Sequence, residues 1–445
     1  MTPSLRTRRI SIIGGGATGV LVAIHLLRSV RACARAEVTL LEPRERLGDG
    51  LAYGTGDGVH LLNVPAGRMG AFPHHPGDFV DWLRDSGQEV EPGAFVPRAL
   101  LGEYLRARLG DAAAKAPTGT RFVHLQQRAA DVLRSAEGWR VLDATGVAHD
   151  ADEVVLATGV ACAAPPAAWN VAQLGNAYLG SPWSAPGLET IHGQEDLLLV
   201  GTGLTAVDAV LTLARRGHRG RVHAVSHHGW WPRVHAQLAP AVPAVQPGMS
   251  VRECLRALRA QVRGGDARAS VDALRAITPA LWDAWPVAER RRFLRHVRAA
   301  WDVHRHRMAP RGAQVLQRLQ DEGRLTTVAG RVLALERTAT GVRAAVAPRG
   351  GGAECGVEVQ RVIGCLGVSP LEGENPLLEA LLRRGTVAPD ALGLGLQVRW
   401  DGAIAGAPGL HAVGPLRRGQ LWESTALPEI RVQAASLAAA LAAST

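Results

Sequence analysis

Two segments of the chain share one order of hydrophobic and polar positions. Residues 9–13 form a short, mostly apolar run that predicts a buried strand, and residues 17–30 place apolar side chains at helical intervals. Residues 37–42 predict a second strand, so this segment indicates a strand, a turn, a helix and a strand. The same order recurs later, with predicted strands at 196–200 and 221–226 on either side of a helical pattern. The chain is therefore predicted to contain two βαβ units.

Glycines fill the first predicted turn in the spacing G-x-G-x-x-G, at Gly14, Gly16 and Gly19. The first glycine permits the tight turn, the second lets the backbone approach a pyrophosphate, and the third allows the helix to pack closely on the strand. The helix N-terminus then offers N–H groups to phosphate oxygens. Glu42 ends the next strand, where a carboxylate can accept hydrogen bonds from ribose hydroxyls. This unit is predicted to bind a dinucleotide.

The second unit carries the related spacing G-x-G-x-x-A, with Gly201 and Gly203 in the turn. Its second strand ends in Ser226 instead of an acid, and basic residues follow it: His227, His228 and Arg233. Without the acid, a 2′-phosphate meets no carboxylate repulsion, and the hydroxyl and basic groups can donate hydrogen bonds to it. This favours NADPH over NADH, although NADH stays possible and the histidines can also be incidental loop residues.

Two such units in one chain indicate one domain for FAD and one for NAD(P)H. Two further apolar strands, at 153–159 and 361–367, end in glycine and flank the second unit in the sequence, so we expect the NAD(P)H-binding domain to be inserted into the FAD-binding domain. The predicted fold class is α/β, with two Rossmann-like domains and a helical insertion. The predicted boundaries are 1–165 and 359–445 for the FAD-binding domain, 190–245 and 325–358 for the NAD(P)H-binding domain, and 246–324 for the helical insertion on the substrate side.

Arginine is abundant in the predicted helices of the insertion. Arg305 and Arg307 alternate there with two histidines. Because arginine forks suit carboxylates, these two residues are candidates for substrate binding. The alternative is a solvated basic helix end without a ligand.

The charge balance of the chain is basic. In 445 residues, 50 Lys+Arg stand against 40 Asp+Glu, which gives a formal net charge of +10. A basic balance is one feature of nucleic-acid-binding proteins. Here acidic residues are spread among the basic ones, no block of five like charges occurs, and Lys115 is the single lysine. We interpret the near-absence of lysine as a trait of the encoding genome. Much of the arginine surplus falls in the helical insertion and around the second glycine motif, where it can hold the phosphates of the dinucleotides and a small acidic substrate. We predict no nucleic-acid partner, with a nucleic-acid binder kept as the less favoured alternative.

The cysteines and apolar runs indicate neither a metal site nor a membrane span. The five cysteines are widely spaced without a C-x-x-C pair, which disfavours a zinc site and a disulfide framework. No apolar run reaches the roughly 18 residues that a membrane span needs. The basic N-terminus precedes a glycine-containing stretch, which suits a strand and a turn better than a signal peptide. We predict a cytoplasmic protein without a metal.

Three motifs together resemble one protein family. They are the glycine turn at 14–19, the run His60-Leu-Leu-Asn-Val-Pro-Ala-Gly-Arg-Met-Gly70, and the C-terminal run 414–433. With these motifs the chain resembles the FAD/NAD(P)-binding proteins that include bacterial FAD-dependent urate hydroxylases and aspartate N-monooxygenases. More distantly it is similar to the ornithine and lysine N-hydroxylases. The resemblance covers most of the chain and is weakest at 110–150 and 325–358.

The resemblance also implies positions for cofactor-binding residues. Asn63 and Met69 would lie along the flavin ring or the channel beside it. Gly414 stands where many flavoproteins carry Gly-Asp, but Pro415 replaces that acid. A last helix, predicted at 429–441, would point its N-terminus at the flavin and stabilise the reduced anion. The predicted cofactor-binding residues are Gly14, Gly16, Thr18, Gly19, Glu42, Asn63, Met69, Thr158, Gly159, Gly201, Gly203, Thr205, Ser226, Gly367, Gly414 and Thr425.

The activity implied by the resemblance is that of an FAD-dependent, NAD(P)H-consuming monooxygenase. NADPH would reduce FAD, the reduced flavin would add O2 to give a C4a-hydroperoxide, and this species would transfer oxygen to a small amine, amino acid or heteroaromatic substrate. The alternative is an NAD(P)H-dependent flavin reductase or dehydrogenase without oxygen insertion. The expected partners are a small-molecule substrate and O2. The sequence does not indicate the catalytic residues, the substrate or the oligomeric state.

Overall fold

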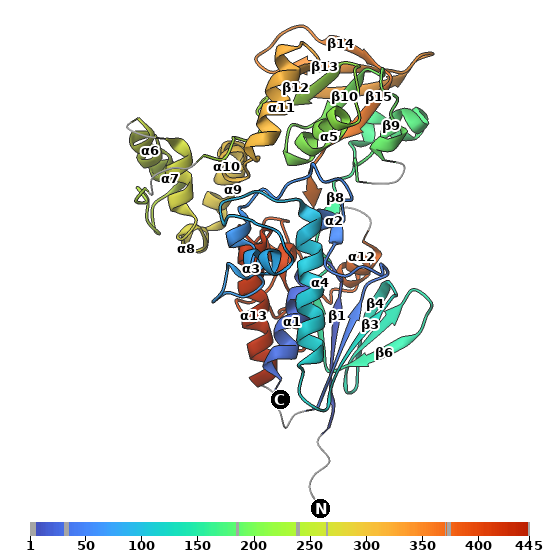
Figure 1. Ribbon diagram of the computed structural model, residues 1–445, viewed down its shortest axis with the longest axis vertical. Helices are drawn as coiled ribbons and strands as arrows, with labels where there is room; N and C mark the ends of the chain where they lie inside the picture. Colours follow the sequence, from blue (N-terminus) through green and yellow to red (C-terminus); the bar gives the residue numbers. More distant parts are fainter. Residues whose placement is uncertain are drawn as a thin grey trace, which may run out of the picture. The chain divides into compact units, whose positions relative to one another are not determined.

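The structure is a computed structural model, and it describes residues 6–30, 35–183, 187–236, 241–263, 266–369, 371 and 375–443. The chain forms two compact units, each built around a sheet of mostly parallel strands (Figure 1). The first unit consists of Met1–Gly58, Val64–Ala161 and Ser369–Thr445, and the second of Val59–Asn63 and Cys162–Val368.

The sheet of the first unit is parallel throughout and runs in the order β17-β7-β1-β2-β3. Its central strands are buried apolar runs, as the sequence pattern predicts for a sheet covered on both faces. Because the strands are parallel, their carboxyl ends share one edge, where ligands of such sheets bind. The strands are β1 (Arg8–Ile13), β2 (Ala36–Leu41), β3 (Thr120–Leu125), β7 (Glu153–Leu156) and β17 (Leu410–Ala412).

Different elements cover the two faces of this sheet (Figure 1). On one face α1 packs against both α4 and α13. On the other, an antiparallel sheet in the order β4-β5-β6 and helix α12 enclose a core that includes Trp139 and Leu381. These elements are α1 (Ala17–Ser29), α4 (Arg98–Ala114), α13 (Leu427–Ala443), β4 (Ala129–Ser135), β5 (Gly138–Asp143), β6 (Ala148–Ala151) and α12 (Pro376–Arg383).

The second unit has a mixed sheet in the order β14-β13-β12-β11-β10-β15-β9. Strands β12, β11, β10, β15 and β9 are parallel to their neighbours, and β12, β13 and β14 continue as an antiparallel meander. The strands are β9 (Tyr178–Leu179), β10 (Leu197–Val200), β11 (Val222–Ser226), β12 (Leu325–Arg337), β13 (Val342–Pro348), β14 (Cys355–Val359) and β15 (Arg361–Gly364).

Helices of the second unit fall into two groups. Helices α5 and α11 pack on one face of the mixed sheet, in a core that includes Val207 and Leu316. Between β11 and α11 the chain forms a run of further helices, α6 to α10, most of them short. The helices are α5 (Leu204–Arg215), α6 (Val251–Val262), α7 (Ala267–Leu274), α8 (Thr278–Ala284), α9 (Val287–His296), α10 (Arg298–Arg305) and α11 (Pro310–Asp321).

The predicted α/β fold class is confirmed, and both βαβ units form where the sequence places them. Two assignments differ in detail. Strand β15 pairs with β10 and therefore belongs to the second unit, whereas the predicted FAD-binding domain resumed at residue 359. The short stretch Val59–Asn63 also joins the second unit, although it precedes the second βαβ unit by more than a hundred residues.

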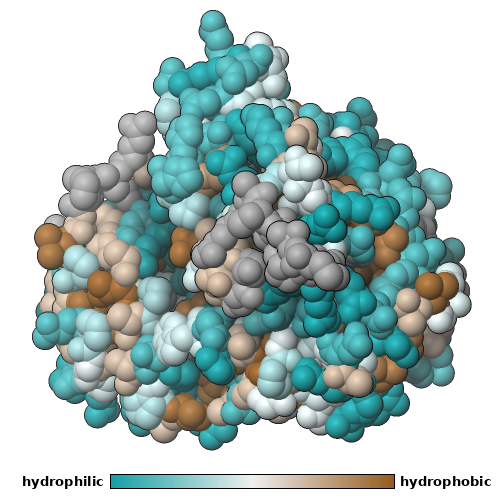
Figure 2. All heavy atoms as spheres, turned by 90° about the horizontal axis from the view of Figure 1, so that it is seen from below, coloured by the Kyte–Doolittle hydropathy of each residue, from teal (hydrophilic) through white to brown (hydrophobic). Residues whose placement is uncertain are grey.

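The surface is mainly polar on the face shown in Figure 2, where hydrophilic residues predominate and hydrophobic ones are scattered in small groups. Within the described ranges, none of the helices combines the length and the apolar character needed to cross a membrane. The described cysteines, Cys162, Cys254, Cys355 and Cys365, are free thiols.

Candidate functional site

From the end of β1 into the first turn of α1, the backbone leaves no room for a side chain at Gly14, Gly15 or Gly19. Gly14 has a φ of +103°, and a Cβ atom there would lie 2.5 Å from the Ala157 carbonyl oxygen. A Cβ atom on Gly19 would lie 1.9 Å from the Gly14 carbonyl oxygen. Both contacts are too short for any side chain. The two glycines therefore let the turn close and let α1 pack on the sheet, as dinucleotide-binding turns require.

A cleft of about 840 Å3, including the space open to solvent, lies at the carboxyl ends of β1, β2 and β7. Its wall also includes the short helix α2 (Gly50–Tyr53) and the first residues of α13. The predicted residues that line it are Gly14, Gly16, Thr18, Glu42, Thr158, Gly159 and Thr425. The fold of the first unit thus gathers residues from its N-terminal, middle and C-terminal segments around one hollow.

Two features of the cleft suit a nucleotide pyrophosphate. Gly16 caps α1 and lines the cleft, and a Cβ atom placed there would meet Gly50 at an ordinary contact distance of 3.4 Å. The first N–H groups of α1 are available to phosphate oxygens at this end. In addition, the Thr158 hydroxyl is buried and has no hydrogen-bond partner among the described residues. Since buried polar groups are nearly always satisfied, this hydroxyl is suited to a polar atom of a ligand.

The Glu42 carboxylate is nearly buried and braces the glycine turn. Its Oε2 accepts a hydrogen bond from the Gly15 N–H at 2.9 Å, and its Oε1 accepts one from the Arg44 N–H at 3.2 Å. The Arg44 side chain pairs with Oε1 at 3.3 Å and donates to the Gly50 carbonyl at 2.9 Å. Arg44 and Gly50 both line the cleft and were not predicted from the sequence. The sequence feature that could have identified Arg44 as a cleft residue is its position two residues after Glu42.

Replacing Glu42 by alanine is expected to weaken FAD binding at least about tenfold, because hydrogen bonds to a charged group contribute about 1.5–3 kcal/mol. Titration of the apoprotein with FAD, followed by flavin fluorescence, measures the change. Glu37→Ala is the matched control, because Glu37 lies on β2, which Glu42 directly follows, but outside the cleft. The control should keep its Kd within about twofold of the wild type. Equal Kd values for the two variants would refute this role of Glu42.

The C-terminal segment completes the cleft wall. Gly414 has a φ of +76°, and a Cβ atom there would lie 3.0 Å from the side chain of Thr18. Helix α13 starts at Leu427, slightly before the predicted residue 429, and lines the cleft with Leu427 and Ile430. This end of the wall is apolar, in agreement with the absence of the acid that many flavoproteins carry after this glycine.

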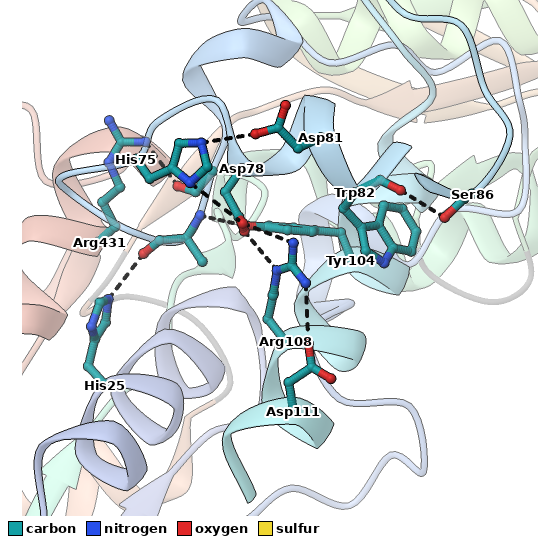
Figure 3. A network of polar contacts seen from close by, with 12 residues as sticks. His25, His75, Asp78, Asp81, Trp82, Ser86, Tyr104, Arg108, Asp111 and Arg431 are labelled. Carbon is teal, nitrogen blue, oxygen red and sulfur yellow. Dashed lines mark hydrogen bonds and ion pairs between the residues drawn. The ribbon is translucent and has the colours of Figure 1, made fainter. Parts of the chain in front are cut away.

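Buried polar contacts hold the segment Ala66–Ala71, which follows the cleft-forming turns in the chain (Figure 3). The Ala71 N–H donates to the Tyr104 hydroxyl at 2.7 Å, and the Ala71 carbonyl accepts from His25 Nε2 at 3.1 Å. Arg431 Nη1 donates to two further carbonyls of the segment, at 2.9 and 3.0 Å. Because these three side chains belong to α1, α4 and α13, three helices fix one short segment.

Tyr104 is itself fixed by a carboxylate (Figure 3). Its hydroxyl donates to Asp78 Oδ2 at 2.5 Å, and Arg108 donates to both oxygens of Asp78, at 2.8 and 2.9 Å. Burial, reinforced by the hydrogen bond to Asp78, raises the pKa of Tyr104 well above its usual range, so the hydroxyl keeps its proton. Asp78 begins α3 (Asp78–Asp85). No sequence motif indicates this network, because its members come from separate helices.

The two residues that the resemblance places along the flavin fall in different units. Met69 is buried in the first unit, within the segment that the helices hold. Asn63 belongs to the second unit with the rest of Val59–Asn63. In this stretch His60 Nε2 lies 2.8 Å from Thr212 Oγ1 of α5. Neither Met69 nor Asn63 lines the cleft described above.

The turn between β10 and α5 also excludes a side chain at its first glycine, as the turn between β1 and α1 does. Gly201 has a φ of +115°, and a Cβ atom there would lie 2.1 Å from the Cys365 carbonyl oxygen. Apart from its chain neighbours, none of the described residues has an atom within 4 Å of a Cβ placed on Gly203, so this backbone is open to a ligand. Ala206 is fully buried in the place of the third glycine. Three other predicted residues surround the turn region: Thr205 in the first turn of α5, Ser226 at the end of β11, and Gly367 after β15.

The arginines predicted to bind substrate are buried among the short helices. Arg305 is 8% exposed and Arg307 is 2% exposed. Arg307 donates to the carbonyls of His304 and Arg268 at 2.7 Å and to the Asp272 carboxylate at 2.9 Å. These contacts tie α10 to α7, so Arg307 is not a solvated helix end. Within the described part of the chain, no group of three His, Cys, Asp or Glu side chains is arranged to hold a metal ion.

Comparison with known proteins supports the dinucleotide-binding geometry. Residues 11–161 match the model of a family described as FAD-NAD(P)-binding. This match confirms the prediction of a dinucleotide-binding domain in the N-terminal part of the chain. No curated protein matches the chain.

Solved structures similar to this chain include several N-hydroxylases. Reduced ornithine hydroxylase from Pseudomonas aeruginosa matches with a TM-score of 0.68 at 16% identity, over 98% of either chain. L-lysine 6-monooxygenase from Pseudomonas syringae matches with a TM-score of 0.67 at 21% identity, over 98% of this chain and 99% of that one. The ornithine N-hydroxylase of Kutzneria sp. 744, in a complex with reduced FAD, NADP+ and L-ornithine, matches with a TM-score of 0.66 at 15% identity, again over 98% and 99%. These likenesses show a shared fold over nearly the whole chain.

Proposed function

We propose that the protein is an FAD-dependent, NADPH-consuming monooxygenase, with FAD in the cleft of the first unit and NADPH at the glycine turn of the second. The observation that carries this proposal is the pair of glycine turns, each closing a parallel βαβ unit of its own. It is supported by the fold likeness, over nearly the whole chain, to hydroxylases of ornithine and lysine, one of them in a complex with reduced FAD and NADP+. The domain limits predicted from the sequence are part of this proposal, with the second limit moved from 359 to 369.

The residues of the first cleft suit FAD. The backbone at Gly16 and the N-terminus of α1 would bind the pyrophosphate, and the Thr158 hydroxyl would satisfy a further polar atom. Glu42 would hold the turn in shape and accept a hydrogen bond from the ribose. When bound, FAD can accept hydride from NADPH and, once reduced, activate O2. At the second turn, the open backbone of Gly203 would bind the pyrophosphate of NADPH.

The proposed substrate is a small amine, an amino acid or a heteroaromatic molecule. Two of the similar structures are named as hydroxylases of ornithine and lysine. The sequence motifs resemble those of urate hydroxylases and aspartate N-monooxygenases, which extends the class to acidic and aromatic molecules. The proposal includes no nucleic-acid partner. It places the protein in the cytoplasm, because free thiols such as those of the described cysteines are typical of a reducing compartment.

A flavin reductase without oxygen insertion is the alternative, because one fold can host several functions. The free, separate cysteines among the described residues disfavour a disulfide reductase. Oxygen uptake separates the two activities. The monooxygenase should oxidise NADPH faster with its substrate, from a panel of aspartate, ornithine, lysine, urate and small aromatics, and should form hydroxylated product in proportion. NADPH oxidation that no panel member couples to a product would support the reductase instead.

A further inference from the structure

The sequence suggests the Ser226 hydroxyl as a donor to a 2′-phosphate, but this hydroxyl already forms hydrogen bonds within the protein. Thr202 Oγ1 donates to the Trp230 carbonyl at 2.6 Å, and a threonine hydroxyl has one proton. Ser226 Oγ must therefore donate in the hydrogen bond that joins it to Thr202 Oγ1 at 2.7 Å. Ser226 Oγ also accepts the Gly229 N–H at 3.1 Å. Ser226 consequently shapes the turn at 226–230 and has no proton left for a phosphate.

An arginine from a distant hairpin reaches this same turn. Arg349 lies in the loop between β13 and β14, 121 residues from His228 in the sequence, and its Nη1 donates to His228 Nδ1. The Trp230 ring stacks on the imidazole of His228, with centroids 4.4 Å apart and planes inclined by 21°. The stacked imidazole thus holds the guanidinium at the end of β11.

The charged groups that act on His228 are basic. Burial, together with the nearby charges of Arg349 and His227, lowers the pKa of His228. The imidazole is therefore neutral at pH 7 and can accept the hydrogen bond from Arg349. In the part of the chain that the structure describes, Arg349 forms no ion pair with a carboxylate, whereas Arg343 of the same hairpin pairs with Glu358 at 2.7 Å. The Arg349 charge is thus suited to an external anion.

We propose that Arg349, positioned by His228, binds the 2′-phosphate of NADPH and sets the preference for NADPH over NADH. The turn at 226–230 follows β11, and in Rossmann-type domains the ribose of the dinucleotide lies at the end of this second strand. A guanidinium matches phosphate oxygens with two parallel hydrogen bonds. The inference rests on the proposed NADPH site and adds the residue that distinguishes the two cofactors.

Calorimetric titration of the full-length protein with NADP+ and with NAD+ tests this assignment. Arg349→Ala should weaken NADP+ binding by about 10- to 100-fold and keep NAD+ binding within about twofold, because only NADP+ carries the 2′-phosphate. Arg343→Ala is the matched control, since it removes an equal charge from the same hairpin. The control should leave both affinities within about twofold.

Two variants of His228 separate positioning from general damage to the turn. His228→Ala should reduce NADP+ affinity about three- to tenfold, because the guanidinium loses its acceptor. His228→Asn keeps an acceptor near the place of Nδ1 and should recover most of that affinity. NAD+ binding should stay within about twofold in both variants.

Several results would overturn the assignment. They are an equal loss of both nucleotides in Arg349→Ala, no loss of either, or a wild-type protein that binds NAD+ as tightly as NADP+. A wild type that binds neither nucleotide would refute this inference and the proposed function together. NADP+ preference without any oxygenated product would refute only the monooxygenase, because the titration requires neither FAD nor O2.

Discussion

Gly16→Trp is expected to lower the FAD content of the purified protein to less than about a tenth of the wild-type value, while the first unit stays folded. A loss of only about 1.4 kcal/mol in the free energy of FAD binding weakens the affinity tenfold. Gly16 has an ordinary backbone conformation, with φ of −69°, and a Cβ there meets nothing nearer than 3.4 Å. The new side chain is therefore tolerated at its base. Its indole must extend into the cleft where the pyrophosphate is proposed to lie.

Gly110→Trp is the matched control for this variant. Gly110 lies on α4 in the same unit, is exposed, and has nothing within 4 Å of a Cβ placed on it. Flavin absorbance per protein measures the occupancy, and circular dichroism checks that both variants fold. Full FAD content in a folded Gly16→Trp protein would contradict the assignment of the first cleft as the FAD-binding site.

Asp78→Ala is expected to destabilise the first unit by about 3–5 kcal/mol, the usual cost of removing one partner of a buried ion pair. The Asp78 carboxylate accepts from the Tyr104 hydroxyl and from two nitrogens of Arg108. Without it, the Tyr104 proton loses its acceptor, and Arg108 keeps only the exposed Asp111 carboxylate, 3.2 Å away. Tyr104→Phe should cost less, about 1–3 kcal/mol, because it leaves one carboxylate oxygen and the Ala71 N–H without that partner.

Urea unfolding at equilibrium, monitored by circular dichroism, measures these changes. Asp81→Ala supplies the control, because Asp81 lies on the same helix as Asp78 with its side chain 48% exposed and pairs with His75 at the surface. Removing this exposed pair should cost no more than about 1 kcal/mol. Similar unfolding midpoints for Asp78→Ala and Asp81→Ala would show that the network adds little stability.

The two glycine turns could be predicted from the sequence because the spacing of the glycines between a strand and a helix is a local pattern. The contacts that exclude a side chain are local only at Gly19, which meets the Gly14 carbonyl. Gly14 and Gly201 meet Ala157 and Cys365, which follow β7 and β15 far along the chain. The βαβ order predicts the strands, the first helices and the edge of the sheet where the cleft lies. Residues such as Gly16 and Glu42 could therefore be assigned to a site from their place in the sequence alone.

Other parts of the sites depend on contacts between segments that no pattern links. The meeting of Arg349 with His228 needs the β12–β14 meander to fold back beside β11, and nothing in either segment indicates it. The hydrogen bonds from Arg431 to the segment Ala66–Ala71 likewise join residues more than 360 positions apart in the sequence. Ser226 shows a further limit, because its hydroxyl lies at the end of β11, as the sequence indicates, but donates its only proton to Thr202. Such an assignment requires the position of every donor and acceptor around the hydroxyl.

In the proposed reaction, one atom of O2 enters a small substrate at the expense of NADPH. The most direct test supplies the FAD-loaded protein with NADPH, 18O2 and the panel member that most stimulates NADPH oxidation, and analyses the product by mass spectrometry. We predict a product that carries one 18O atom and forms in proportion to the NADPH consumed. Product without the label, or complete recovery of the NADPH electrons as hydrogen peroxide with every panel member, would contradict it.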